Sequence, residues 1–142
     1  MIKDLPSIYF TQDVDKNFDV KASQALLQEC NNRMGLKGEF KRISLYAKHS
    51  NKTVAGAIGF VHGQIMWIDS IYVEEAFQNK GLGGQIISEL TQIAEKYNLR
   101  EMQLNTYFPR AFAFFKKYGF EEVAAVPGWK YDITCYLMRK II

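Results

Sequence analysis

The chain has 142 residues, which is typical of one domain and enough to bury a core without disulfides or a metal. Hydrophobic residues make up 48% of the chain and charged residues 23%, so the composition excludes a disordered protein. The net charge is only +3 and the basic residues are scattered, which argues against a nucleic-acid-binding protein.

The cysteines and the apolar stretches indicate the compartment. Cys30 and Cys135 form no Cys-x-x-Cys pair, so a structural zinc site is excluded on ligand count. Two cysteines are enough to form one disulfide, but two isolated thiols are more typical of a protein whose cysteines are reduced. The start of the chain has no apolar run of signal-peptide length, and no stretch in the sequence is apolar for the length of a membrane span. We therefore expect a cytoplasmic protein with no bound metal and no membrane association.

The first half of the chain shows helical and strand-like periodicity, with no linker and no internal repeat. Apolar residues near helical spacing predict one helix, and runs of β-branched residues between short turns predict strands. In chain order we expect a strand at 5–12, a helix at about 20–34, a polar connector at 36–41, and strands at 43–48, 53–61 and 64–73. The last three strands are joined by short turns, which predicts an antiparallel meander.

The second half contains the clearest helix, over about 84–97, where apolar residues recur at helical spacing. The elements that follow are a strand at 101–106, a helix at about 109–118, and strands at 120–126 and 131–139 around a turn at Pro127–Gly128. A strand, a helix and a second strand in succession predict a right-handed crossover and a parallel pair. The sequence thus predicts one mixed α/β domain over residues 1–142, with a largely antiparallel sheet.

Glycines gather where the predicted strand 64–73 leads into the clearest helix. Gly81, Gly83 and Gly84 allow a tight turn and the close approach of a ligand to the backbone. The free N–H groups and the partial positive charge of a helix start favour a phosphate or diphosphate. The stretch lacks the Gly-Lys-Ser/Thr of a Walker A loop, and Ile86 stands where a dinucleotide fingerprint needs its third glycine. The alternative is a glycine-rich helix start that binds nothing.

The pattern Gln78-x-x-Gly81-x-Gly83 resembles the acetyl-CoA loop of the GNAT superfamily of N-acetyltransferases, which reads Arg/Gln-x-x-Gly-x-Gly/Ala. A second resemblance lies downstream, in Ala111, the aromatic pair Phe114–Phe115 and Gly119–Phe120. The resemblance covers roughly residues 40–125. It implies a GNAT-like fold, with a twisted sheet whose parallel strand pair splays apart and which about three or four helices flank.

Two positions depart from the family pattern. Phe108 stands where the second signature has Asn, and Phe115 stands where the family frequently has Tyr. In the family that Tyr often gives a proton to the departing thiol, and Phe has no proton to give. Residue 115 therefore cannot act as the general acid in this chain.

The resemblance implies acetyl-CoA as cofactor, with the pantetheine arm between the splayed strands and the diphosphate on the N–H groups of residues 79–84. The arm carries amides, so it can pair with the backbone of Ile71 and Val73 like an added strand. The residues that the resemblance assigns to the cofactor are Ile71, Tyr72, Val73, Gln78, Asn79, Lys80, Gly81, Leu82, Gly83, Gly84, Asn105, Phe114, Phe115 and Lys117. Lys80 has the alternative of being simply solvated.

An amine acceptor is mostly protonated at neutral pH, so a base must take its proton, directly or through water. Asp69 is our first candidate, because it has the same strand parity as Ile71 and Val73, and Glu74 is the second. The alternative for Asp69 is a carboxylate satisfied by structural hydrogen bonds. We expect the Val73 N–H to donate to the oxygen on which negative charge develops.

The general acid that protonates the departing thiol and the residues that bind the acceptor have weaker signals in the sequence. Tyr118 is our candidate acid in place of Phe115, with Tyr107 or water as alternatives, and a core position is the simpler reading of Tyr118. Trp67, Trp129 and Tyr131 are candidates to line the acceptor pocket, and Trp129–Tyr131 has the alternative of a homodimer contact. His49 and His62 lie in or beside turns, where we expect exposed side chains.

These observations lead to two hypotheses. The first is an N-acetyltransferase that transfers the acetyl group of acetyl-CoA to a primary amine of a small molecule or peptide by direct attack. The second is a catalytically weak CoA-binding regulatory module, which the phenylalanine at position 115 motivates. The sequence does not identify the acceptor.

Overall fold

The computed structural model describes residues 11–12, 15–35 and 41–142, and within these ranges the fold is a six-stranded sheet with helices. The strand order is β1-β2-β3-β4-β6-β5, with β3 and β4 parallel and the other neighbours antiparallel. The strands are β1 (Lys41–His49), β2 (Lys52–His62), β3 (Ile65–Val73), β4 (Glu101–Thr106), β5 (Glu121–Lys130) and β6 (Ile133–Ile141). The helices are α1 (Lys16–Arg33), the short 3-10 helix η1 (Glu75–Phe77), α2 (Leu82–Lys96) and α3 (Pro109–Lys117).

The meander and the parallel pair joined through a helix are both confirmed. Strands β1, β2 and β3 pair in sequence, and α2 connects β3 to the parallel strand β4. The mixed α/β class with one parallel pair is therefore as predicted. The predicted strand 5–12 and the connector 36–41 lie almost wholly outside the described residues.

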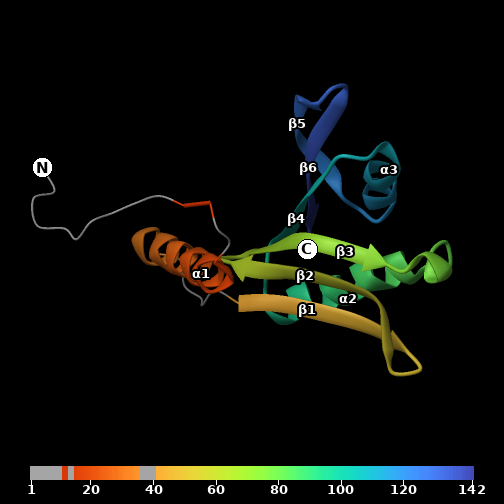
Figure 1. Cartoon of the computed structure of the whole chain (residues 1–142), viewed down its shortest axis with the longest axis horizontal. Helices are drawn as coiled ribbons and strands as arrows, with labels where there is room; N and C mark the ends of the chain where they lie inside the picture. The colour runs from red at the N-terminus through yellow and green to blue at the C-terminus, as the bar shows by residue number, and fades with distance from the viewer. Residues whose placement is uncertain (1–10, 13–14, 36–40) are drawn as a thin grey trace, which may run out of the picture.

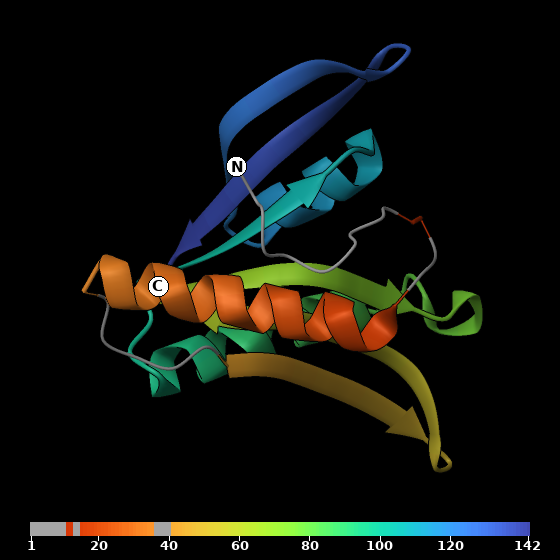
Figure 2. The ribbon, with the colours of Figure 1, turned by 60° about the vertical axis from the view of Figure 1, so that its left-hand side comes forward.

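Helix α1 begins at Lys16, four residues before the predicted start at position 20. The reason is a cap, because the Asp15 carboxylate accepts hydrogen bonds from the N–H groups of Asn17 and Phe18, both at 3.0 Å. The sequence interpretation rested on apolar spacing and passed over this aspartate. In Figure 2, α1 lies in front of β2 and the edge of β3, β1 runs below it, and α2 lies behind the strands.

The core lies between the sheet and α2. The helix buries Ile86, Ile87, Leu90 and Ala94, which are among the positions that its periodicity marked. They pack with Met66 of β3, Met102 of β4 and Met138 of β6, all fully buried. Burial of this apolar stripe stabilises the crossover that holds β3 and β4 parallel.

The parallel junction between β3 and β4 is short. Only three residue pairs join the strands, Ile65–Glu101, Met66–Met102 and Trp67–Gln103, and beyond them the strands separate. Figure 1 shows the result as two arms, with β1–β3 in one and β4–β6 rising away from β3 in the other. The second half of β3 thus has a partner on one side only within the described sheet.

A β-bulge interrupts β3 at the point of separation. Ile58 pairs with Ser70 and Gly59 with Ile68, so Asp69 has no partner in β2. A Cβ at Gly59 would overlap the carbonyl oxygen of Trp67 and lie 3.1 Å from its carbonyl carbon, so glycine is needed for this close approach. The extra residue changes which positions face the core, from Met66 and Ile68 before the bulge to Ile71 and Val73 after it.

The hairpin at the end of the chain reverses later than predicted. We expected the turn at Pro127–Gly128, but β5 continues to Lys130 and the reversal is at Tyr131–Asp132. The pairing of β5 with β6 is irregular between Val126 and Lys130, and Gly128 has a φ of +72°. The Pro-Gly pair therefore produces a bulge inside the strand, because a left-handed residue can also accommodate a bulge.

Candidate active site

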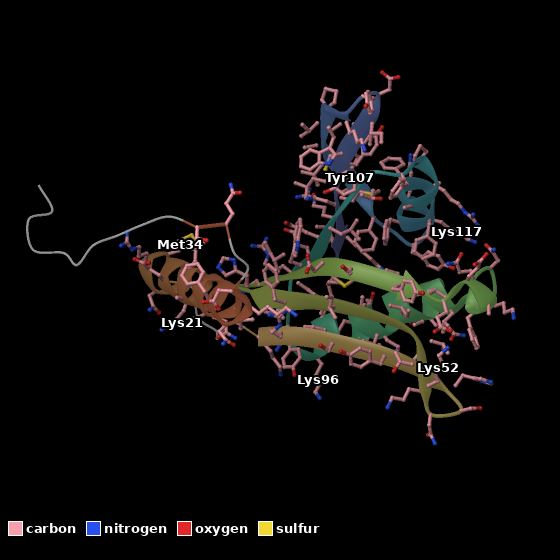
Figure 3. The ribbon with its side chains drawn as sticks, in the orientation of Figure 1. Lys21, Met34, Lys52, Lys96, Tyr107 and Lys117 are labelled. Carbon is pink, nitrogen blue, oxygen red and sulfur yellow. The ribbon has the colours of Figure 1, made fainter. Side chains whose placement is uncertain are left out.

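A cavity of about 760 Å³ opens where the end of β3 and the start of α2 face α3. It is lined by Ile71, Val73, Phe77, Gln78, Asn79, Gly81, Leu82, Gly83, Gly84, Phe108, Arg110, Ala111, Phe114, Phe115, Lys117 and Tyr118. The structure therefore brings most of the residues predicted for the cofactor, together with Tyr118, to one place. Figure 3 shows Lys117 on the lower part of α3, above the turn that follows β3.

Left-handed backbone residues and one side-chain hydrogen bond fix the conformation of the turn between β3 and α2. Asn79 and Gly81 have left-handed φ values of +59° and +84°, and Gly81 forms the N-cap of α2 without a side-chain cap. The side-chain amide of Gln78 donates a hydrogen bond of 2.9 Å to the Val73 carbonyl, which closes the turn against the strand. The first N–H groups of α2 are thus left for a ligand, as in other helix N-terminal anion sites.

Two of the glycines have a packing role in addition. A Cβ at position 83 would lie 3.0 Å from Cζ of Phe114, and one at position 84 would lie 2.5 Å from Cζ of Tyr118. The absence of side chains at Gly83 and Gly84 therefore lets α2 and α3 approach closely. Phe114 in turn packs against Phe115 and Tyr118, with ring centroids 5.2 Å and 4.9 Å away.

The charges on the cavity wall are positive. Arg110 and Lys117 are its charged residues, and none of the described lining residues is acidic. Sequence reasoning named Lys117 and missed Arg110, whose Nη2 donates a 2.8 Å hydrogen bond to the Asn79 side-chain oxygen. The sequence did contain a signal for Arg110. It lies two residues after Phe108, the position where the family signature has Asn, and in the first turn of the predicted helix that follows. Phe77 is a second lining residue that the sequence did not indicate.

The backbone of β3 beyond the bulge presents hydrogen-bonding groups toward the separated strand. The Glu74 N–H donates to the Val54 carbonyl at 2.8 Å, so position 74 is directed toward β2. Because successive residues of a strand direct these groups to opposite sides, those of Ile71 and Val73 are directed away from β2. Neither residue pairs with β4, which separates after Trp67 and Gln103.

The two candidate bases differ in their surroundings. Asp69 is exposed at the bulge, and its carboxylate has no hydrogen bond or ion pair in the described part of the chain. Its parity with Ile71 and Val73 does not place it on their face, because the bulge reverses the alternation between them. Glu74 is engaged in an ion pair, with its carboxylate 3.1 Å from the Lys52 ammonium.

Three residues predicted for the cofactor do not line the cavity. Tyr72 is 66% exposed and alternates with Ile71 and Val73, so it lies on the other face of the strand. Lys80 is exposed, with its ammonium 5.9 Å from the Phe77 ring centroid. Asn105 is exposed in β4, where it pairs with Leu137.

The residues predicted for the acceptor lie outside this cavity as well. Trp67 is half-buried at the last pair before β3 and β4 separate, whereas Trp129 is 60% and Tyr131 89% exposed on the terminal hairpin. Trp129 packs against Tyr107, with ring centroids 5.4 Å apart, and Figure 3 shows Tyr107 at the base of that hairpin. Partial burial raises the pKa of the Tyr107 phenol, and the Cys135 thiol adds to the increase.

The histidines contribute nothing to the cavity. His49 is exposed as expected, with its ring 5.4 Å from that of Phe77. His62 differs from the expectation, because it is half-buried and its Nε2 has no hydrogen-bond partner among the residues that the structure describes. Neither is among the lining residues.

Comparison with known proteins agrees with this architecture. A family model described as the acetyltransferase (GNAT) family matches residues 5–120. The chain belongs to the GNAT acetyltransferase family. The cofactor of this family is acetyl-CoA. None of the helices in the described ranges is long and apolar enough to cross a membrane.

Individual relatives are distant. The blasticidin-S acetyltransferase of Streptomyces morookaense is 24% identical over 107 residues, which cover 72% of this chain and 79% of the relative. An Agrobacterium tumefaciens protein assigned as an acetyltransferase has a TM-score of 0.82 at 14% identity, over 96% of this chain and all of that one. A Bacillus anthracis protein assigned as a streptothricin acetyltransferase was solved with acetyl coenzyme A. It has a TM-score of 0.66 at 19% identity, over 72% of this GNAT chain and 63% of that one.

Proposed function

We propose that this GNAT protein is an N-acetyltransferase that transfers the acetyl group of acetyl-CoA to a primary amine of a small molecule or peptide by direct attack within a ternary complex. One observation carries the proposal. At Ile71 and Val73, the edge of β3 that faces away from β2 pairs with no strand of the described sheet, and it lines the same cavity as the glycine turn at Gly81–Gly84. A strand edge suits an amide-bearing arm and a helix start suits a diphosphate, and acetyl-CoA contains both.

The residues present fit this cofactor. The Ile71 backbone and the Val73 carbonyl, which also accepts from Gln78, would pair with the pantetheine amides, so the Val73 N–H is left for the thioester oxygen. The N–H groups of residues 79–84 would hold the diphosphate. Arg110 and Lys117 add positive charge, and no carboxylate among the described lining residues opposes it. When bound, acetyl-CoA supplies an acetyl group already activated as a thioester.

We assign the proton-accepting role to Asp69, directly or through a water molecule. Its carboxylate is exposed at the bulge beside the separation of β3 and β4, and it has no hydrogen bond or ion pair in the described structure. Glu74 is the second candidate, with Lys52 as a competing partner. The Val73 N–H would donate to the carbonyl oxygen as negative charge develops there, a contribution of about 10²–10³ in rate for one such donor.

Tyr118 remains our candidate for the acid, with Tyr107 or water as alternatives. Tyr118 lines the cavity and packs on Gly84 at the start of α2. A tyrosine with an ordinary pKa of about 10 is protonated at neutral pH. The pKa of Tyr107 lies above that value, so its phenol is a weaker acid than an ordinary tyrosine. The residue in the usual family position, Phe115, lines the same cavity without a hydroxyl group.

A Phe115→Tyr variant is therefore expected to raise turnover at pH 7, and not to change the affinity for CoA. A thiol with a pKa of about 8.5 leaves a gap of about 1.5 units at pH 7, which limits the gain to about 30-fold. The measurement is the steady-state rate of thiol release. Phe114→Tyr is the matched control, and an equal gain in both variants would argue against a position-specific acid.

The acceptor is proposed from the relatives and from the exposed aromatic residues. The chain resembles one protein named a blasticidin-S acetyltransferase and another assigned as a streptothricin acetyltransferase. Trp67, Trp129 and Tyr131 are proposed to line the acceptor site, on the side of the strand separation away from the cavity. Trp129 and Tyr131 would alternatively form a homodimer contact.

The second candidate function is a CoA-binding regulatory module with weak catalysis, which the phenylalanine at position 115 favours. A single pair of measurements separates the two. Calorimetry gives the affinity for CoA, and thiol release from acetyl-CoA is followed with a panel of antibiotics, polyamines, amino acids and peptides. Turnover with one class of amine supports the transferase, whereas tight CoA binding with no turnover on any amine supports the module.

A further inference from the structure

Arg110 forms a polar bridge between the two walls of the cavity. One wall is the turn from Gln78 to Gly84, and the other is α3. The Arg110 Nη2 donates to the Asn79 side-chain oxygen at 2.8 Å, and both residues line the cavity. This bond uses one of the five N–H donors of the guanidinium, and the described chain provides no side-chain partner for the other four.

No carboxylate of the described residues neutralises the charge of the Arg110 guanidinium. No carboxylate lies within ion-pair distance of it among the described residues, and the described lining of the cavity is free of acids. Arg110 also lies in the first turn of α3, where the helix dipole disfavours a cation. A guanidinium in such a place, held by a neutral amide, is suited to an anion that enters the cavity.

We propose that Arg110 binds a phosphate group of the cofactor and that Asn79 orients it for this purpose before the cofactor arrives. The inference rests on the proposed function and adds a ligand from α3 to the diphosphate turn. Asn79 has a left-handed φ of +59°, which directs its side chain from the turn to Arg110. A long side chain held in advance loses less conformational entropy on binding.

Phosphate groups occur at two places in CoA, the diphosphate and the ribose 3′-phosphate. The two are separated by comparing CoA with dephospho-CoA, which lacks the 3′-phosphate. Calorimetry on the full chain would measure both ligands with wild type, Arg110→Gln and Arg110→Lys. A loss seen with CoA alone assigns Arg110 to the 3′-phosphate, and a loss seen with both ligands assigns it to the diphosphate.

We expect Arg110→Gln to weaken CoA binding about 10- to 100-fold, the range for a charge-assisted hydrogen bond. Arg110→Lys should recover part of this loss, because lysine keeps the charge without the planar fork. Arg100→Gln is the matched control, since Arg100 is exposed and does not line the cavity, and its affinity should equal that of wild type.

The orienting role of Asn79 is tested with Asn79→Gly, which keeps the left-handed backbone and removes the side chain. We expect a smaller loss, about 2- to 10-fold, consistent with the entropy of one side chain. In an Asn79→Gly/Arg110→Gln double variant, removal of Asn79 should add nothing further, because its effect acts through Arg110.

Three outcomes would overturn parts of this account, and they can be told apart. If wild type does not bind CoA, the proposed function fails and the inference fails with it. If wild type binds CoA and Arg110→Gln binds both ligands equally well, the proposed function stands and Arg110 is not a phosphate ligand. If Asn79→Gly weakens binding equally with and without Arg110, Asn79 acts on the turn itself and does not orient the guanidinium.

Discussion

A Gly83→Trp variant is expected to show no measurable binding of CoA while it retains a folded core. Position 83 lies in the first turn of α2 and lines the cavity. Even a Cβ there would stand 3.0 Å from the Phe114 ring, so an indole has to occupy the space between the turn and α3. We expect the affinity to fall by at least about 100-fold, since the diphosphate would lose its helix N-terminus.

The loss must be separated from unfolding, because overpacking typically destabilises a protein by about 1–3 kcal/mol. Calorimetry with CoA is therefore combined with circular dichroism and a urea titration. Gln92→Trp adds the same ring to an exposed position of the same helix, away from the cavity, and should bind like wild type. Gly83→Ala should give an intermediate affinity. A folded Gly83→Trp protein with unchanged affinity would mean that the turn is wrongly assigned.

An Asp69→Asn variant is expected to lose turnover, with the largest deficit below neutral pH. Removal of a general base typically lowers the rate by about 10²–10⁴. An aliphatic amine with a pKa of about 10.4 becomes increasingly deprotonated as the pH rises, so the need for a base declines. The ratio of the wild-type rate to the variant rate should therefore fall from pH 6 toward pH 9.

The measurement is kcat/KM across this pH range with an accepted amine, together with the affinity for CoA, which should not change. Glu74→Gln tests the second candidate, and its rate should stay near that of wild type because Glu74 is paired with Lys52. Asp132→Asn is the matched control in an exposed turn of the terminal hairpin. A pH profile of Asp69→Asn parallel to that of wild type would remove Asp69 from the role of base.

The sequence predicts well those features that depend on local periodicity and on glycine. The spacing of Ile86, Ile87, Leu90 and Ala94 predicted α2, and the glycines before it indicated the turn that lines the cavity. Both are local, because a helix stripe and a left-handed turn are determined by residues close together in the chain. The parallel pair followed from the order of strand, helix and strand.

Apart from the local Asp15 cap of α1, the features that the sequence missed depend on contacts between residues that are not neighbours in the chain. The bulge at Asp69 exists because Gly59 on another strand lets the Trp67 backbone approach, so strand parity alone misplaced the Asp69 side chain. The bridge from Arg110 to Asn79 joins residues 31 positions apart. In the terminal hairpin, pairing with β6 decided whether Gly128 would form a reversal or a bulge.

Because the parallel junction is short, the two ends of the cofactor would be bound by different kinds of contact, the strand edge of β3 at one end and charged groups at the other. Hydrogen bonds to a neutral strand edge contribute only about 0.5–1.5 kcal/mol each, so Ile71 and Val73 would add little to affinity beside the charged groups. Their contribution would be register, because a shift by one residue reverses the side to which a strand's backbone groups point. The phosphate groups of acetyl-CoA would then determine its affinity. The six residues of β3 beyond Trp67 would determine the position of the thioester carbon along the strand.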